Sequence, residues 1–372
     1  MVPIKVGVVG VGHLGKHHAR ILAGMPNAKL VGIADVSPAA KEIAQQYNVP
    51  AYSNYQALAQ QADALVLAVP TRYHHALGCP LLRSGKHLLI EKPLACSSAE
   101  TEELVDLAQA AGVVLAVGHV ERFNPALEAA GDSLKEVKYL EASRTSGYTF
   151  RSTDIGVVLD LMIHDIDLAL SIVCEPVTRV EAFGVSIFGQ HEDVAQARLT
   201  FADGCQATLN ASRTSYAAVR TLQAWTPKGF VQLDLASRQA TVVQPDANIL
   251  AGRLKLDELT AEQREQCKTH LFEELLRKQT RTPEPCDQLT AELGNFLHAV
   301  QTGTSPRVDG RQGSAAVRVA ERVLRSIWTH AWDTSAPIRT GPFLAQRPTS
   351  ILRGPHWSQT PAHLPPLENR AG

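Results

Sequence analysis

The first 120 residues alternate short apolar runs with segments of helical periodicity. Each run is almost continuously apolar, which is typical of a strand buried on both faces, and an amphipathic segment follows it. This alternation predicts an α/β fold with a doubly wound parallel sheet and helices on both of its faces. The predicted strands are residues 4–10, 29–35, 64–70, 86–93 and 113–119.

The second half of the chain has a different pattern. The apolar segment 155–173 predicts a helix buried on most of its surface, and strand-like runs separated by turn signals follow it. They predict an α+β region with a large, mostly antiparallel open sheet that helices cover on one face. We expect the uncovered face to be apolar and to pack on a second copy, giving a homodimer or homotetramer. The runs are residues 177–188, 194–201, 205–212, 220–226 and 230–235.

These patterns predict a first domain at residues 1–122, a second at 123–334 and a proline-rich tail at 335–372 that is extended or disordered. Within the second domain, an insert at 257–285 carries a charged segment, 259–279, that we expect to be helical. A pair of helices is expected around 288–300 and 311–330.

Composition excludes several classes of protein. The chain has 36 basic and 37 acidic residues, so neither nucleic acid nor an anionic membrane is expected as the main partner. The six cysteines are scattered without a CxxC pair, which favours a reduced, cytoplasmic protein over a disulfide framework or a zinc ribbon. We find neither a signal peptide at the N-terminus nor a charge-free apolar run of about 18 residues, so no membrane span is expected.

The first predicted strand leads directly into GVGHLG, a GxGxxG motif that opens a helix. An acidic residue ends the second predicted strand, and this context is the fingerprint of dinucleotide binding in a Rossmann domain. The glycines let the backbone approach a pyrophosphate, and the acidic residue would bind the adenine ribose. No arginine follows Asp35 to hold a 2′-phosphate, so NAD is predicted rather than NADP. The predicted cofactor residues here are Gly10, Gly12, His13, Leu14, Gly15 and Asp35.

His13 and His17 have the i, i+4 spacing of some metal sites. The sequence places no carboxylate between or near them, and a nucleotide should occupy this end of the helix. No metal site is therefore expected.

Ligands of an open parallel sheet bind outside the carboxyl ends of its strands. Polar residues follow three of the predicted strands there. Pro70, Thr71 and His74 follow the third, and Glu91 and Lys92 follow the fourth; all five are expected near the cofactor. Arg122 and Asn124 follow the fifth and are expected near the substrate.

The buried helix at 155–173 carries polar residues at i, i+4 and i+7, namely Asp160, His164 and Asp167. At roughly 100° per residue they share one stripe, while Asp165 points elsewhere. Buried carboxylates are costly without partners, so the stripe faces either a polar network or a cavity.

GxGxxG, PTxxH, EKP and DxxxHxxD, in this order, resemble the motifs of the Gfo/Idh/MocA oxidoreductase family over residues 3 to 330. The resemblance implies a Rossmann domain followed by an α/β domain whose open sheet packs on another subunit. It also implies that Lys92 is catalytic and that Asp160, His164 and Asp167 line the substrate site. The segments RSTDIGVVLDLMIHDIDL and GHVERFNPA are similar to UDP-N-acetylglucosamine 3-dehydrogenases, and the helix motif is also similar to inositol dehydrogenases.

The resemblance implies NAD-dependent oxidation of a ring secondary alcohol to a ketone, with the 3-hydroxyl of a UDP-N-acetylhexosamine as the favoured target. His164 suits a proton acceptor at neutral pH, Asp160 would hold it, and Lys92 would stabilise a developing alkoxide. Either Lys92 or His164 could be the formal base. Arg144 and Arg151 could bind a diphosphate. Dehydrogenation of inositol or another cyclic polyol is the alternative, and a nonenzymatic cofactor sensor and an NAD-using glycosidase are less favoured.

Overall fold

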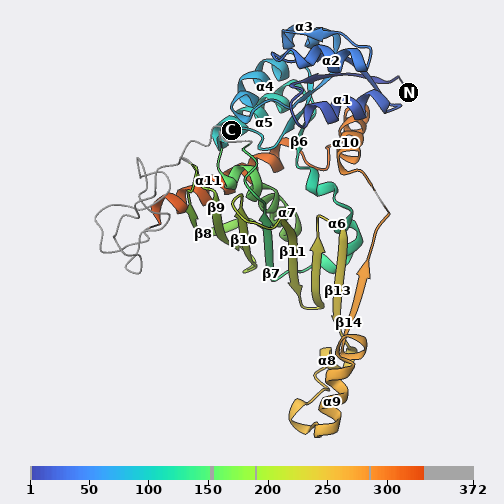
Figure 1. The fold of residues 1–372 in the computed structure, drawn as a ribbon, viewed down its shortest axis with the longest axis vertical. Coiled ribbons are helices and arrows are strands. Elements are labelled where there is room, and N and C mark those ends of the chain that lie inside the picture. Colours follow the sequence, from blue (N-terminus) through green and yellow to red (C-terminus); the bar gives the residue numbers. More distant parts are fainter. Residues whose placement is uncertain (1, 151–154, 189–190, 285, 331–372) are drawn as a thin grey trace, which may run out of the picture.

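The computed structural model describes residues 2–150, 155–188, 191–284 and 286–330. Its N-terminal part is a six-stranded sheet in the order β3-β2-β1-β4-β5-β6, and every pair in it is parallel (Figure 1). The predicted doubly wound sheet is confirmed. β3 was not predicted, because a strand of two residues carries no periodicity. The strands are β1 (Ile4–Val9), β2 (Ala28–Ala34), β3 (Ala51–Tyr52), β4 (Ala64–Leu67), β5 (His87–Glu91) and β6 (Leu115–Gly118).

Helices cover both faces of this sheet. One apolar core lies on the side of α4 and α5, and another lies on the side of α1. Leu293, Phe296 and Leu297 of α10 complete the second core, so a helix from the far end of the chain packs on the N-terminal sheet. The predicted division at residue 122 stays a prediction, but the N-terminal core is not built from residues 1–122 alone. The helices are α1 (Gly15–Gly24), α2 (Ala39–Gln46), α3 (Tyr55–Gln61), α4 (His74–Arg83), α5 (Ser98–Ala111) and α10 (Gln288–Thr302).

The second sheet has eight strands in the order β14-β13-β12-β11-β7-β10-β9-β8. Its strands pair antiparallel except for β7 with β10, so the mostly antiparallel open sheet is confirmed. The sequence patterns did not reveal β7, β13 or β14. The strands are β7 (Tyr139–Thr145), β8 (Val177–Val185), β9 (Val194–Phe201), β10 (Gln206–Ser212), β11 (Val219–Thr226), β12 (Gly229–Asp234), β13 (Gln239–Pro245) and β14 (Leu276–Arg281).

Helices α6 (Pro125–Ala130), α7 (Ile163–Val173) and α11 (Gly310–Thr329) pack on one face of this sheet, where the alternate residues of the strands form a core. No helix of the described residues covers the other face (Figure 1). The expectation that this face is apolar was wrong for most of it, since half-buried glutamine, threonine and asparagine side chains dominate, such as Gln196, Thr208 and Asn210. The apolar part of this face is an aromatic group formed by Tyr139, Trp225 and Phe230, which lie opposite one another on β7, β11 and β12.

The segment between β13 and β14 includes the charged insert and extends away from the N-terminal sheet at that end of the large sheet (Figure 1). It contains α8 (Ala247–Leu250) and, within the insert, α9 (Ala261–Thr269), which begins with a capping box at Thr260 and Gln263. The expectation of a helix through residue 279 was wrong, because Leu276–Arg281 pairs with β13 as an edge strand. Long-range pairing overrides local helix propensity here.

The apolar helix also differs at its start. Residues Val158–Met162 form a single π-helical segment, η4, before α7 begins at Ile163. Glu192 lies under this segment, where its backbone oxygen accepts from Val157 N–H and its carboxylate Oε1 accepts from Val158 N–H. Single π-turns are frequent at functional sites. Among the described residues, no helix is long and apolar enough to cross a membrane.

Candidate active site

A cavity of about 330 Å³ opens where the N-terminal sheet meets the start of α7. Its volume lies in the range of small-molecule sites, which is roughly 300–1,000 Å³. One wall comes from the carboxyl ends of β1, β5 and β6, and the other comes from η4, α7, β7 and β11. The lining includes His13, Leu14, Glu91, Lys92, Tyr148, Asp160, His164, Arg144, Arg213 and Arg220.

The glycine motif has the geometry that a dinucleotide needs. Gly10 has a φ of +87°, which favours glycine, and a Cβ on Gly15 would collide with the carbonyl oxygen of Gly10. A Cβ on Gly12 would meet nothing within 4 Å, so open space lies over the loop where a pyrophosphate would approach. The loop ends at the N-terminus of α1, where the positive end of the helix dipole favours an anion.

Asp35 holds the same loop from the end of β2. Its Oδ2 accepts from Val11 N–H at 2.6 Å, and its Oδ1 accepts from Ser37 N–H at 2.8 Å. Each carboxylate oxygen can accept a second hydrogen bond, so Asp35 can still bind ribose hydroxyls. The residues present therefore fit NAD.

Lys92 and Asp160 meet across the cavity from different parts of the chain. The Nζ of Lys92 donates to the backbone oxygen of Asp160 at 2.6 Å and to its Oδ1 at 3.1 Å. A lysine ammonium has three donors, so one donor remains for a ligand. The π-turn at η4 presents both oxygens of Asp160 to this contact.

His164 lines the cavity one turn after Asp160, and its Nδ1 is buried without a hydrogen-bond partner in the described chain. Burial holds the pKa of His164 well below its ordinary value of 6.5, and the charges of Lys92 and Arg144 lower it further. The ring is therefore neutral at neutral pH, as a proton acceptor must be.

Asp167 does not line the cavity with the other two residues of the stripe. It is 2% exposed and accepts from Arg122 Nη1 at 3.3 Å, with the ring of His119 4.0 Å away. Arg122 also lies outside the cavity lining and donates to the backbone oxygen of Arg307. The expectation that Arg122 and Asp167 contact the substrate is not supported by this geometry, because each has the other as its partner.

Two more predicted ligands belong to buried frameworks. Asn124 is 0% exposed; its amide donates to Glu121 and to Leu235 O, and its Oδ1 caps α6. His74 is buried, and its ring nitrogens contact the backbone oxygens of Val69 and Pro93, joining the chain after β4 to the chain after β5. Both residues join elements behind the cavity walls, and neither lines the cavity. Pro70 and Thr71 form the short connection before α4, also outside the cavity lining.

Arg144 lines the cavity, but buried carboxylates occupy its guanidinium. Nη1 donates to Glu121 at 2.7 Å, and Nε and Nη2 donate to Asp165. Burial lowers the pKa of Arg144, but Asp165 and Glu121 raise it above its ordinary value, so the group stays charged. This pairing leaves Arg144 poorly placed to bind a diphosphate. Arg151, the other predicted diphosphate ligand, lies outside the described residues.

A third histidine of α1, His18, has a buried carboxylate partner that the sequence did not reveal. The Nε2 of His18 contacts Oε1 of Glu91 at 2.6 Å in the interior, next to Glu292 of α10. Burial raises the pKa of Glu91, but the hydrogen bond and charge of His18 give a net lowering. Only the packing of α1 and α10 against β5 brings these residues together, so no local pattern could have revealed the contact.

Sequence reasoning missed the cations on β11 and beyond β10. Arg220 lies directly opposite Arg144 in the β7–β11 ladder and is exposed in the cavity, with no ion pair to any described residue. Arg213 also lines the cavity, packs over the ring of Tyr148 and donates to Asp193 at 2.7 Å. Strand periodicity assigns Arg220 to a face but gives no signal that this face ends at a cavity.

A dinucleotide-binding sheet with a lysine, a carboxylate and a neutral histidine around one cavity defines an NAD-dependent oxidoreductase. Residues 4–119 match the oxidoreductase family model for an NAD-binding Rossmann fold, and residues 133–232 match the GFO/IDH/MocA C-terminal domain. The chain belongs to the Gfo/Idh/MocA oxidoreductase family.

Two relatives are similar to this chain over most of its length. A UDP-N-acetylglucosamine 3-dehydrogenase of Acidithiobacillus ferrooxidans is 31% identical and covers 87% of this chain and 97% of the relative. Its solved structure has a TM-score of 0.76 at 29% identity and covers 88% of this chain and 98% of that chain. A scyllo-inositol 2-dehydrogenase (NAD(+)) of Bacillus subtilis is 28% identical and covers 82% of this chain and 88% of the relative.

Proposed function

We propose that this chain oxidises a ring secondary hydroxyl to a ketone, with a UDP-N-acetylhexosamine as substrate and its 3-hydroxyl as the reacting group. One observation carries the chemistry: Lys92, Asp160 and His164 line the same cavity as His13 and Leu14 of the glycine loop. A substrate in this cavity would lie between a proton acceptor and the cofactor loop.

The glycine loop and Asp35 would hold NAD, which would supply the hydride acceptor of the reaction. His164 is neutral and takes the hydroxyl proton. The free donor of Lys92 stabilises the developing negative charge on the reacting oxygen, and Asp160 holds Lys92 in place through two contacts. Buried Glu91, fixed by His18, anchors the end of the strand that carries Lys92.

The choice of substrate rests on the cavity cations and on the relative named above. A nucleotide diphosphate needs fixed cationic donors, and Arg220 is a cation of the lining without an ion pair in the described chain. It replaces Arg144 in this role, because Glu121 and Asp165 occupy Arg144. Dehydrogenation of a free inositol is the second candidate, supported by the inositol dehydrogenase relative.

The test is to incubate the purified chain with NAD and either UDP-N-acetylglucosamine or free inositols, following the absorbance of the reduced cofactor. We expect turnover of the sugar nucleotide. Lys92→Ala and His164→Ala should each lower kcat by about 10² to 10⁴, the usual contribution of a positioned acid–base group. Turnover of inositol alone would overturn the substrate assignment, and near-full activity in both variants would overturn the chemistry.

A matched pair of variants tests the diphosphate subsite. Arg220→Ala should raise KM for UDP-N-acetylglucosamine about tenfold, the effect of losing one charge-assisted contact of about 1.5 kcal/mol. Arg144→Ala should instead lower stability by about 3–5 kcal/mol, because it leaves two buried carboxylates unpaired. An unchanged KM in Arg220→Ala would remove the cation from the subsite.

We further propose a homodimer, or a dimer of such dimers, in which the open face of the large sheet packs on a second copy. The aromatic group of Tyr139, Trp225 and Phe230 on this face supports the proposal, since aromatic residues dominate interface energetics. Cys79, Cys174, Cys205, Cys267 and Cys286 form no disulfide among the described residues, which supports a reducing, cytoplasmic compartment.

A further inference from the structure

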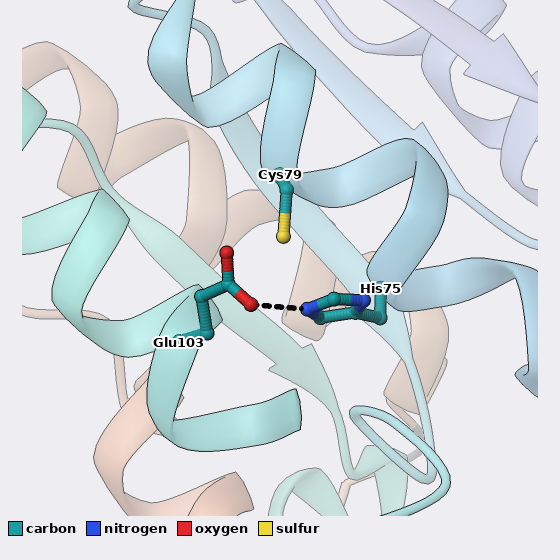
Figure 2. Close-up of side chains that lie close together, drawn as sticks. All are labelled: His75, Cys79 and Glu103. Carbon is teal, nitrogen blue, oxygen red and sulfur yellow. Dashed lines mark hydrogen bonds and ion pairs between the residues drawn. The ribbon is translucent and has the colours of Figure 1, made fainter. Parts of the chain in front are cut away.

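Three metal-ligating side chains converge between α4 and α5, on the face of the N-terminal sheet that α4 and α5 cover. His75 and Cys79 are one turn apart on α4, and Glu103 projects from α5 (Figure 2). Figure 2 shows the sulfur of Cys79 directed toward the His75–Glu103 pair. The three donor atoms lie within 4.8 Å of one another, and none of these residues lines the candidate active site.

The donors match one class of ion. Imidazole, thiolate and carboxylate together suit Zn²⁺, whereas Mg²⁺ and Ca²⁺ prefer oxygen ligands alone. Zinc bonds of about 2.0–2.3 Å keep tetrahedral ligand atoms roughly 3.3–3.8 Å apart. The Nε2 of His75 and Oε2 of Glu103 are 2.8 Å apart, so both need only small rotations to admit an ion. An i, i+4 pair on one helix already presents His75 and Cys79 on the same side.

The charges of the site also suit a divalent cation. Cys79 is 5% exposed, and its sulfur lies beside the carboxylate of Glu103. An ion would replace the thiol proton and balance the two negative ligands, thiolate and carboxylate. Arg83 contacts Oε1 of Glu103 at 2.9 Å from an exposed position, and this leaves Oε2 available as the ligand.

We propose that His75, Cys79 and Glu103 form a zinc site that joins α4 to α5. Three protein ligands leave the fourth position of the tetrahedron to water. His75 and Glu103 are partly exposed, so an ion can enter from solvent, while Cys79 supplies the buried ligand. The site is separate from the proposed dehydrogenase chemistry.

The test is a titration of the tag-free, chelator-treated chain with Zn²⁺ by calorimetry, repeated with Co²⁺ to detect a thiolate-to-metal absorption band. We expect one ion per chain, proton release on binding, and a rise in thermal stability with Zn²⁺. His75→Ala and Cys79→Ser should each weaken Zn²⁺ binding at least about tenfold, as loss of a ligand requires.

Two control variants should bind Zn²⁺ like the original chain. Cys174→Ser removes an exposed thiol, and His270→Ala removes an exposed histidine that pairs with Glu273. His75 is partly exposed, so His75→Ala should fold normally. It therefore tests the site even if Cys79→Ser folds poorly. An absence of Zn²⁺ binding, or equal affinity in His75→Ala, would overturn the site. Neither result depends on dehydrogenase activity.

Discussion

At the scale of single residues, the candidate site depends on which titratable groups are charged. Lys92 keeps its contacts with Asp160, and His164 is neutral because of burial and nearby cations. Lys92 is thus the cation that can stabilise an alkoxide, and His164 is the neutral base. Each role follows from the surroundings of the residue rather than from its type alone.

The first prediction concerns the pH dependence of turnover. A proton acceptor must be neutral, and the lowered pKa of His164 keeps it neutral to lower pH than an ordinary histidine. We expect the acidic fall of kcat/KM to lie below about pH 6.5, the unperturbed histidine value. Measuring kcat/KM against pH tests this, and a fall centred above that value would contradict the neutral-base role.

The second prediction concerns Glu292, which is 3% exposed and whose carboxylate oxygens have no hydrogen-bond partner among the described residues. Burial raises its pKa well above the ordinary value, and the charge of Glu91 raises it further. A raised folded-state pKa gives stability at low pH that is lost as pH rises through it. Glu292→Gln stays neutral, so its gain in thermal stability should be larger at about pH 8.5 than at about pH 5.

Thermal melts at both pH values measure this gain. Glu175→Gln is the matched control, because Glu175 is exposed and should show no pH-dependent difference. An equal change for Glu292→Gln at both pH values would mean that its carboxyl titrates normally.

At the scale of elements, the position of Asp160 depends on a π-helical segment held from below by Glu192. Gly156, just before η4, is buried directly against the Glu192 carboxylate. Glu192 is itself fixed by its bond to Val158 N–H, and burial raises its pKa to about 7. This local packing sets the position of Asp160 relative to Lys92.

The third prediction follows from this packing. A Cβ in Gly156→Ala would overlap the Glu192 carboxylate and displace η4, because Glu192 is too buried to move away easily. We expect kcat to fall by up to about 10²-fold with NAD binding retained, since small misplacements of catalytic groups are costly. Gly24→Ala is the control, because a Cβ there meets nothing within 4 Å. Steady-state kinetics of both variants test this prediction. Normal turnover in Gly156→Ala would show that the contact with Glu192 does not position Asp160.

At the scale of the whole molecule, the large sheet has one face that no helix of the described residues covers. Its covered face packs on α7 and α11, and its open face combines polar side chains with one aromatic group. Polar residues make this face tolerable in water, so the open face alone does not require a partner. The aromatic group is where a second copy would gain most from burial.

The fourth prediction tests the proposed assembly. Trp225→Asp places a charge in the centre of the aromatic group and should shift the chain toward monomers in light scattering, because a buried unpaired charge is costly. Trp328→Asp is the control, since Trp328 is exposed at the end of α11 on the covered side of the sheet. Equal molar masses for Trp225→Asp and the original chain would exclude this face as the interface.

Much of the fold could be predicted because its signals are local. Apolar runs with the glycine motif predicted the parallel sheet and NAD, and turn signals predicted five strands of the second sheet. Strands without such signals were not predicted. β3 is too short, and β14 lies in a charged segment that becomes a strand only because it pairs with β13. The periodicity of buried residues can be read from the local sequence, whereas the pairing of a strand depends on which strand the fold places beside it.

The residues that could do chemistry are recognisable from the sequence, but only folding shows which of them meet. Lys92, Asp160 and His164 stand in recognisable motifs, and the fold brings them to one cavity. Arg144 was indistinguishable in sequence from a phosphate ligand until the fold placed Glu121 and Asp165 around it, whereas Arg220 has no ion pair to any described residue. Charge partners come from distant elements, so a guanidinium's role is fixed by packing geometry and desolvation, which no local pattern records.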